Sequence, residues 1–180
     1  MAGRGPFDGG PPIGPAVLRP EIHADARGTT SEIANTDAFR TLGLPATWPH
    51  ALVSYSKADT LRGLHWQMPA QGKLVRCVTG SIFDVAVDVR QDSATFGEAR
   101  FATLTPADVA WIPPGFAHGF LALELSHVVY LCDRARSLDE HVLRWDAIPG
   151  ILWPLPQCGY ILSDRDRNAP ALAEITPCLV

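Results

Sequence analysis

A histidine stands in the middle of an apolar stretch that has the composition of a β-strand. In LRGLHWQ, residues 61–67, the leucines suit a buried strand, whereas Arg62 and His65 do not. A neutral imidazole can take up a proton near pH 7, and it does so better when a carboxylate orients its other nitrogen. A lone histidine in such a place is more often a core residue whose hydrogen bonds are satisfied. His65 is therefore a proton-transfer group, a hydrogen-bonding group or packing.

A second histidine follows a turn in WIPPGFAHGF, residues 111–120. The spacing from Pro113 to His118 resembles the second half of the signature of cupin barrels. Metal-binding cupins have His-x-His and then a carboxylate in the first half, but here Gln67 replaces the second histidine and GLHWQMPAQGK contains no Asp or Glu. Because this stretch cannot supply three or four ligands, we expect a cupin without a metal. A purely structural role for His118 is about as common as a functional one.

The composition is that of one folded domain. The chain has 180 residues, of which 47% are apolar and 19% charged, so it is long enough for a core and too apolar for a disordered protein. The net charge of −4 and the lack of a basic block argue against nucleic acid as a partner. There is no run of 18 apolar residues and no leader pattern, so we expect a cytoplasmic protein that has no membrane partner.

Short strands must position the candidate residues. Residues 1–16 are rich in Gly and Pro and are predicted to be a disordered tail, followed by one domain over residues 17–180. Apolar residues alternate from Phe83 to Val89, which predicts a half-buried strand, and Thr79-Gly80 marks a tight turn. Further strands are expected in AVLRPEIH (an edge strand), EARFATLT, DVAWIPPG, HGFLALEL and SHVVYLCD.

Few helices are expected. Residues 36–43 predict a short helix that Thr36 caps and Gly43 ends, and a helical turn is expected near Ser137 to Glu140. The whole pattern predicts an all-β fold, a sandwich or a cupin-type jelly-roll barrel with a C-terminal extension. Such barrels often enclose a ligand cavity, so an inward-facing polar residue would line that cavity.

From about Pro20 to Pro170 the chain is similar to the dTDP-4-dehydrorhamnose 3,5-epimerase family. The similarity lies, in order, in LRGLHWQ, AQGKLVRCVTGSIFDVAVDVR, SATFGEA, WIPPGFAHGFLAL and RWD…GILWPL…ILSDRDRNAP. The resemblance implies a homodimer of cupin barrels that needs no cofactor. It implies an isomerase that epimerises the carbons beside the ketone of a 4-keto-6-deoxy sugar nucleotide, with dTDP as the expected nucleotide.

The same resemblance implies the roles of individual residues. His65 would be the base, oriented by Asp166, while Tyr130 would be the acid and Lys73 would stabilise the enolate. The nucleotide diphosphate and its surroundings would be bound by Arg62, His118, Arg165, Gln67, Arg27 and Glu32.

The chemistry of the residues agrees with these roles. Only Lys57 and Lys73 among the 15 basic residues are lysine. A compact ammonium suits a developing oxyanion, whereas the planar guanidinium of arginine suits phosphate. Without the resemblance, Lys73 would be a solvated residue beside a hairpin, Tyr130 a core tyrosine and Asp166 part of a solvated charged run.

Three stretches depart from the family pattern. Thr29 and Thr30 stand where the family usually has aromatic residues, ALVSYS (residues 51–56) lacks its usual Gln and Asn, and no pair of tyrosines follows Tyr130. Changed contacts of this kind alter which substrate binds, so we expect epimerisation at one carbon only or on an unusual sugar. A sugar-nucleotide-binding protein that has lost catalysis is the alternative, and a metal-dependent cupin enzyme is a weaker one.

Overall fold

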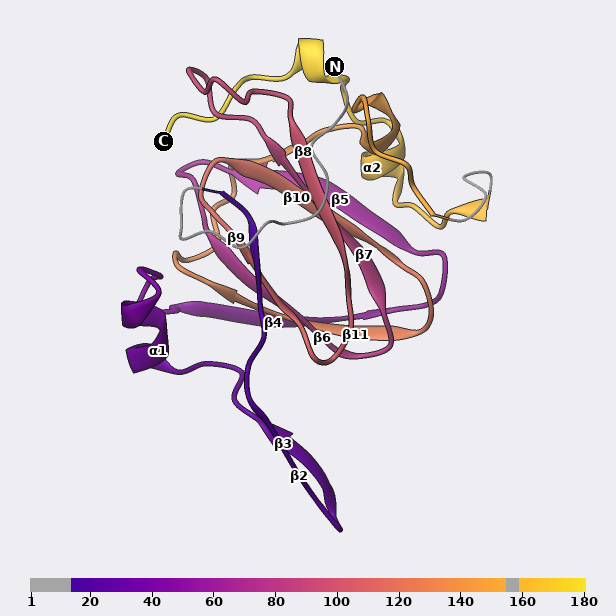
Figure 1. Ribbon diagram of the computed structural model, residues 1–180. Helices are drawn as coiled ribbons and strands as arrows, with labels where there is room; N and C mark the ends of the chain where they lie inside the picture. Colours follow the sequence, from indigo (N-terminus) through magenta and orange to yellow (C-terminus); the bar gives the residue numbers. More distant parts are fainter. Residues whose placement is uncertain (1–13, 155–158) are drawn as a thin grey trace.

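The computed structural model describes residues 14–154 and 159–180 of the chain, and it contains two five-stranded antiparallel sheets that form a barrel (Figure 1). In order across the first sheet, the strands are β1 (Ala16–Leu18), β9 (Val109–Ile112), β6 (Lys73–Thr79), β11 (Ser126–Cys132) and β4 (His50–Ser56). In order across the second, they are β12 (Glu140–Val142), β5 (Leu61–Gln67), β10 (Phe116–Ala122), β7 (Ile82–Asp88) and β8 (Ala99–Leu104). This is the predicted jelly-roll barrel.

The N-terminal region differs from the prediction in two places. Ala16 already belongs to β1, one residue before the predicted domain start, while residues 1–13 of the predicted tail lie outside the described residues. The single strand predicted over residues 16–23 is two strands, since β1 ends at Leu18 and β2 (Ile22–Asp25) begins after Pro20. β2 pairs with β3 (Gly28–Ser31), and this hairpin projects from the barrel (Figure 1).

The helices are short, and they differ in detail from the expectation. α1 (Thr36–Thr41) is capped by Asn35 rather than Thr36, because the Asn35 side chain accepts hydrogen bonds from two backbone N–H groups of the first turn. Gly43 follows its end with a φ of 70°, as predicted. No helix forms at Ser137 to Glu140, where the chain instead enters β12.

Among the described residues that follow β12, three further short helical elements are present, and none of them was predicted from the sequence. They are η1 (Trp145–Ala147), α2 (Asp164–Arg167) and η3 (Leu172–Glu174).

The core extends to both faces of the second sheet. β7 is buried along its whole length rather than on one face, so the half-buried strand that the alternation predicted is wrong. The even-numbered side chains of β7 point into the barrel, where Ala86 packs in one cluster with Phe120 and Val128. Its odd-numbered side, Phe83, Val85 and Val87, packs in a second cluster outside the barrel.

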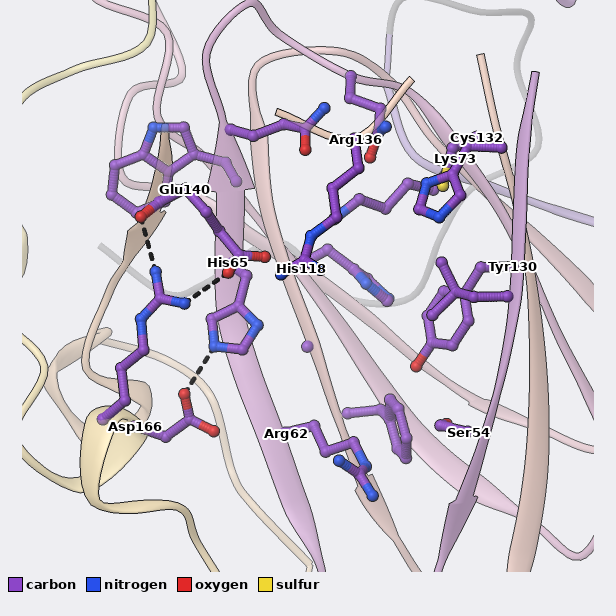
Figure 2. A pocket seen from close by; sticks show the side chains of 18 of the residues that line it. Ser54, Arg62, His65, Lys73, His118, Tyr130, Cys132, Arg136, Glu140 and Asp166 are labelled. Carbon is purple, nitrogen blue, oxygen red and sulfur yellow. Dashed lines mark hydrogen bonds and ion pairs between the residues drawn. The ribbon is translucent and has the colours of Figure 1, made fainter. Parts of the chain in front are cut away.

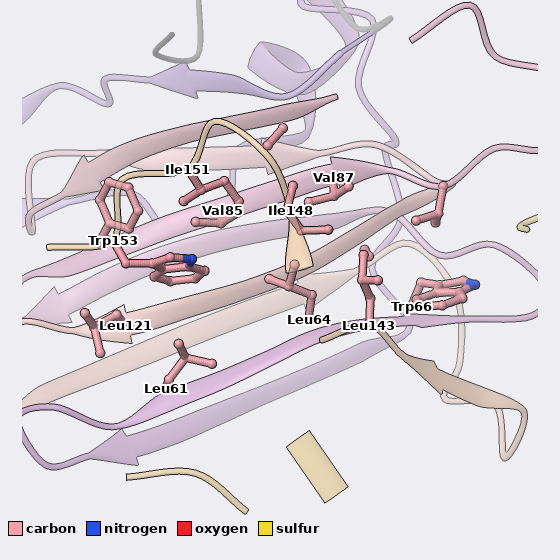
Figure 3. Packing of buried hydrophobic residues seen from close by; sticks show 14 of the residues in the cluster. Leu61, Leu64, Trp66, Val85, Val87, Leu121, Leu143, Ile148, Ile151 and Trp153 are labelled. Atoms are coloured by element: carbon pink, nitrogen blue, oxygen red, sulfur yellow. The ribbon is translucent and has the colours of Figure 1, made fainter. Parts of the chain in front are cut away.

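The C-terminal segment, which follows β12, covers the outer face of the second sheet (Figure 3). Ile148, Ile151 and Trp153 from this segment pack against Leu61, Leu64, Val85 and Leu121 of the sheet. Burial of each such side chain contributes about 1.5–3 kcal/mol. Backbone hydrogen bonds attach the segment to β5, from Leu61 N to Ile161 O at 3.0 Å and from Leu143 N to Leu64 O at 2.9 Å. These contacts bring α2 to β5.

Glycine allows the central strands of the second sheet to approach closely beside the two histidines of the motifs. A Cβ at Gly119 would lie 2.4 Å from the carbonyl oxygen of Arg62, and one at Gly63 would lie 2.7 Å from the Cα of Gly119. Gly63 also has a φ of 112°, which favours glycine. The register of β5 and β10 shifts here and places His65 directly opposite His118.

Candidate active site

A hollow of about 660 Å³ opens in the barrel and gathers most of the predicted residues (Figure 2). Its walls come from β4, β5, β6, β10 and β11 and from α2. Eight of the ten predicted residues line it: His65, Asp166, Tyr130, Lys73, Arg62, His118, Arg165 and Gln67. Sequence positions more than 100 residues apart therefore share one cavity.

His65 and Asp166 form a hydrogen-bonded pair on one wall. The Nε2 atom of His65 lies 2.6 Å from Oδ1 of Asp166, and the two side chains are 27% and 6% exposed. Asp166 is fixed by α2, whose N-cap Ser163 accepts a hydrogen bond from the Asp166 backbone N–H. The other carboxylate oxygen faces the Gly63 backbone N–H at 3.4 Å. Asp166 is thus a buried residue, not the solvated one that its charged run indicated.

The Asp166 carboxylate is kept ionised by its surroundings. Burial acts to raise its pKa, but the hydrogen bond to His65 and those from Gly63 and Ser163 outweigh burial and lower the pKa below its usual value. An ionised Asp166 holds the imidazole by one nitrogen and stabilises an imidazolium. The other nitrogen of His65 is then free to take a proton.

Lys73 and Tyr130 lie across the hollow from His65 (Figure 2). Burial lowers the pKa of Lys73, although nearby Cys132, Glu140 and Asp84 oppose this effect. Burial raises the pKa of Tyr130 well above its usual value, so its hydroxyl keeps its proton at neutral pH. The hollow therefore contains a carboxylate-paired imidazole on one side and a neutral phenol hydroxyl on the other.

His118 is held by a carboxylate of its own. Its Nε2 atom lies 2.8 Å from Oδ2 of Asp84, and both side chains are almost fully buried. The His118 ring also lies edge-on to Tyr130, with 6.3 Å between the ring centres. His118 therefore helps to fix the wall of the hollow beside Tyr130.

The arginines of the hollow differ in how firmly they are held. Arg62 donates to Ser56 Oγ and to the Tyr55 carbonyl, both at 3.0 Å, and Arg165 pairs with Glu140 at 2.5 Å. Arg136 extends into the hollow on the side away from Arg62 (Figure 2).

Gln67 supports the segment that bears Arg136. It donates to the Ala135 carbonyl at 3.3 Å and accepts from the Ser137 backbone N–H at 3.2 Å. Its first role is thus to hold the 135–137 segment, although its side chain also lines the hollow.

Arg27 and Glu32 are not among the residues that line the hollow. Arg27 is exposed on the β2–β3 hairpin and pairs with Asp25 at 2.5 Å. Glu32 accepts a hydrogen bond from Asn35 and lines a separate hollow of about 480 Å³ beside α1. A single chain therefore does not bring these two predicted residues to the site.

The sequence analysis missed several residues that line the hollow, among them His50, Leu52, Gln71, Cys132, Arg136 and Glu140. Alternation along β4 and β11 could have found His50 and Cys132, since each lies two residues from another lining residue of its strand. Arg136 lies in the loop between β11 and β12, and Glu140 is the first residue of the three-residue strand β12, so no periodic pattern indicates their direction.

The arrangement is suited to moving a proton at a carbon atom. A base, a proton donor and a cation face one cavity, which removal and return of a proton next to a carbonyl requires. In the described ranges, no three His, Cys, Asp or Glu side chains gather as a metal site would require. No helix in the described part of the chain is long and apolar enough to cross a membrane.

Comparison with known proteins agrees with the fold and shows the family. The family model described as dTDP-4-dehydrorhamnose 3,5-epimerase matches residues 13–174. The dTDP-4-dehydrorhamnose 3,5-epimerase of Salmonella typhimurium is 41% identical over 164 residues, which cover 87% of this chain and 89% of the relative.

Solved structures agree with this match. A dTDP-6-deoxy-D-glucose-3,5-epimerase from Legionella pneumophila, in complex with dTDP-4-keto-L-rhamnose, has a TM-score of 0.86 at 33% identity and covers 92% of this chain and 93% of its own. A 3'-monoepimerase from Streptomyces bikiniensis, in complex with dTDP-quinovose, has a TM-score of 0.83 at 34% identity and covers 91% and 87%. With a cupin-type barrel and a family match over residues 13–174, the chain belongs to the dTDP-4-dehydrorhamnose 3,5-epimerase family.

Proposed function

We propose that this chain is an epimerase that inverts one or both carbons beside the ketone of a dTDP-linked 4-keto-6-deoxy sugar. The observation that carries the proposal is the placement of the His65–Asp166 pair opposite Tyr130 within one hollow that also contains Lys73. Inversion requires that a proton leaves one face of a carbon and that another arrives on the opposite face. A cavity with a base and an acid on opposite walls supports that sequence.

The reaction follows from the chemistry of these groups. His65 takes the proton from a carbon next to the ketone, and the electron pair of the broken C–H bond forms the enolate. The Asp166 carboxylate stabilises the imidazolium. The Lys73 ammonium stabilises the charge on the former ketone oxygen. Tyr130 gives its proton to the opposite face of the carbon, and solvent exchange returns both groups to their starting protonation states.

The arginines support binding of the nucleotide diphosphate. Arg62 is oriented by Ser56 and Tyr55, which presents its remaining N–H groups to the hollow. A guanidinium forms paired hydrogen bonds with phosphate oxygens. Arg165 is held by Glu140 and Arg136 extends into the cavity, so three guanidinium groups surround a ligand that carries about two negative charges.

A homodimer is part of the proposal. The β2–β3 hairpin projects from the barrel (Figure 1), with Arg27 near its tip, and its residues are nearly all exposed. A two-stranded hairpin is marginally stable alone, which favours a partner that covers it. We infer that the hairpin reaches the hollow of a second copy, where Arg27 and Glu32 act as the family resemblance implies. A cytoplasmic location also belongs to this proposal, because it rests on the sequence prediction alone.

The test is proton NMR in heavy water with a panel of 4-keto sugar nucleotides that differ in the nucleotide and in the sugar. The proposal expects loss of the signal at C3, C5 or both, and the appearance of the inverted sugar. The changed contact positions Thr29, Thr30 and Ser54 make single inversion a specific outcome to look for. Binding of dTDP-sugars without any exchange would overturn the proposal in favour of a binding protein that has lost catalysis.

A further inference from the structure

Most ionisable side chains that line the hollow already have a protein partner. His65 is paired with Asp166, His118 with Asp84, and Arg165 with Glu140. His50 differs from these groups. Its Nδ1 atom is shielded from solvent and has no hydrogen-bond partner among the described residues. Because no hydrogen bond to this nitrogen holds the His50 ring, the imidazole can turn to bond a group that enters the hollow.

The strand that bears His50 turns one face to the hollow. His50, Leu52 and Ser54 occupy alternate positions of β4, and all three line the cavity. The alternation makes the orientation of His50 a property of the strand and not of a loose loop.

The register places His50 in one row with the cation of the site. Cys132 of β11 is paired with His50 of β4 on one side and with Lys73 of β6 on the other. Neighbouring strands are about 4.8 Å apart, so two steps separate the His50 and Lys73 backbones by roughly 10 Å. Both side chains line the same hollow, so they face the same end of a bound ligand.

The thiol between them does not supply a partner for the imidazole. Burial raises the pKa of Cys132 even though Lys73 lowers it, so the thiol stays neutral at pH 7. A neutral thiol is a weak donor and a weak acceptor. A hydroxyl group of a ligand can both donate to an imidazole nitrogen and accept from it, and it is therefore the better partner.

We propose that His50 is a specificity-determining residue that hydrogen-bonds the hydroxyl group on C3 of the sugar. The inference rests on the proposed function, in which Lys73 faces the ketone oxygen at C4. Two carbons flank that ketone in a 4-keto-6-deoxyhexose, and only C3 carries a hydroxyl, since C5 carries a methyl group and the ring oxygen. The His50 imidazole, in one row with Lys73, thus meets the one hydroxyl that is adjacent to the ketone.

The experiment compares two substrates and two proteins. dTDP-4-keto-6-deoxyglucose and its 3-deoxy analogue are given to the parent chain and to His50→Leu, and kcat/KM for hydrogen exchange is measured at the carbon that the parent exchanges. The ratio of kcat/KM for the hydroxylated sugar to kcat/KM for its 3-deoxy analogue is expected to be about tenfold higher in the parent than in His50→Leu. The hydroxyl group also changes the acidity of the C–H bond, but it does so equally in both proteins, so this effect cancels when the ratio of the parent is divided by that of His50→Leu. His50→Gln, which keeps a hydrogen-bonding group, restores part of the preference.

Two controls separate this effect from a general disturbance. His127→Leu makes the same change on β11, where the imidazole bonds Thr79 and does not line the hollow, and it keeps the preference of the parent. Binding of dTDP alone, measured by calorimetry, is unchanged in His50→Leu. An equal preference in the parent and His50→Leu overturns the inference, and so does a tenfold loss of dTDP affinity, which would assign His50 to the nucleotide.

The same four combinations measured by calorimetry distinguish the two proposals. If the sugars bind without exchange, the proposed function fails, while a preference for the 3-hydroxyl that depends on His50 still supports this inference. Exchange that is normal in the parent, with no role of His50 in the preference, overturns the inference alone. If neither sugar nucleotide binds, both proposals fall.

Discussion

Replacement of Asp166 by asparagine removes one charge and almost no volume, and it tests whether the carboxylate acts through His65. The Nε2 to Oδ1 distance of 2.6 Å and the 6% exposure of the Asp166 side chain describe a buried, charge-assisted hydrogen bond. Such bonds contribute about 1.5–3 kcal/mol. The imidazolium that forms on proton abstraction would lose this contribution, and each 1.36 kcal/mol is a factor of ten in rate. We expect the exchange rate in Asp166→Asn to fall by about 10- to 150-fold.

The assay is the rate of deuterium incorporation at the exchanging carbon, at saturating dTDP-4-keto-6-deoxyglucose. Asp164→Asn is the matched control, because Asp164 is an exposed residue of the same helix that does not line the hollow. It is expected to exchange at the parent rate. The melting temperatures of both variants show whether α2 remains in place. A fall of less than threefold in Asp166→Asn, with Asp164→Asn unchanged, would refute the reasoning.

Four further changes have distinct expected outcomes. Lys73→Met lowers kcat for exchange by at least about 100-fold with little effect on dTDP binding, since it removes an interaction with a developing charge, and an effect on KM alone would contradict that role. Tyr130→Phe allows exchange at a carbon but impairs its inversion, and NMR reads both from one sample; inversion at the parent rate would exclude Tyr130 as the acid. Arg136→Met raises KM by about threefold to tenfold at low salt and by less at 0.5 M salt, because salt screens the attraction between an exposed guanidinium and the diphosphate. An increase in KM that is independent of salt would argue against an ionic contact. Burial acts to raise the pKa of Asp88, but hydrogen bonds from Arg90, Ser93 and Thr95 lower it, so the ionised carboxylate stabilises the fold above the unfolded pKa of about 3.9 and this stabilisation is lost as the pH falls below that value. Asp88→Asn therefore lowers the melting temperature at pH 7 by roughly 6–12 °C, and the difference in melting temperature between parent and variant becomes smaller in acid. A difference that stays constant between pH 7 and pH 3 would contradict the assignment.

The strands could be predicted from the sequence because each has an internal signal. Alternation, turn residues and apolar content located β7, β8, β9, β10 and β11. The turn at Gly80, which has a φ of 82°, was also predicted, but it connects β6 and β7 of different sheets and is therefore not a hairpin turn. The burial of β7 on both faces could not be predicted, because its outer face is covered by Trp153 and its neighbours, which lie about 70 residues later. Alternation of apolar residues predicts which side chains of a strand share a face, but it does not predict which distant segment packs on that face.

The candidate site shows the same limit. His65 was conspicuous as a polar residue in an apolar strand, but its partner lies 101 residues away in a helix of four residues, too short to have a periodic pattern. The pair was therefore predicted from the family resemblance and not from the residues alone. Alternation along β4 could have indicated that His50 faces the hollow, but its place in one row with Lys73 depends on the register of three strands. Arg27 was predicted from the resemblance to bind the substrate, but a single chain leaves it exposed on the β2–β3 hairpin, outside the residues that line the hollow.

The most direct test of the central claim is hydrogen exchange by His65→Asn in heavy water. His65 presents one nitrogen to Asp166 and the other to the hollow, so the account makes it the base that removes the proton next to the ketone. It predicts that dTDP-4-keto-6-deoxyglucose still binds to His65→Asn while deuterium enters neither C3 nor C5. Deuterium that enters either carbon at the parent rate would contradict the account.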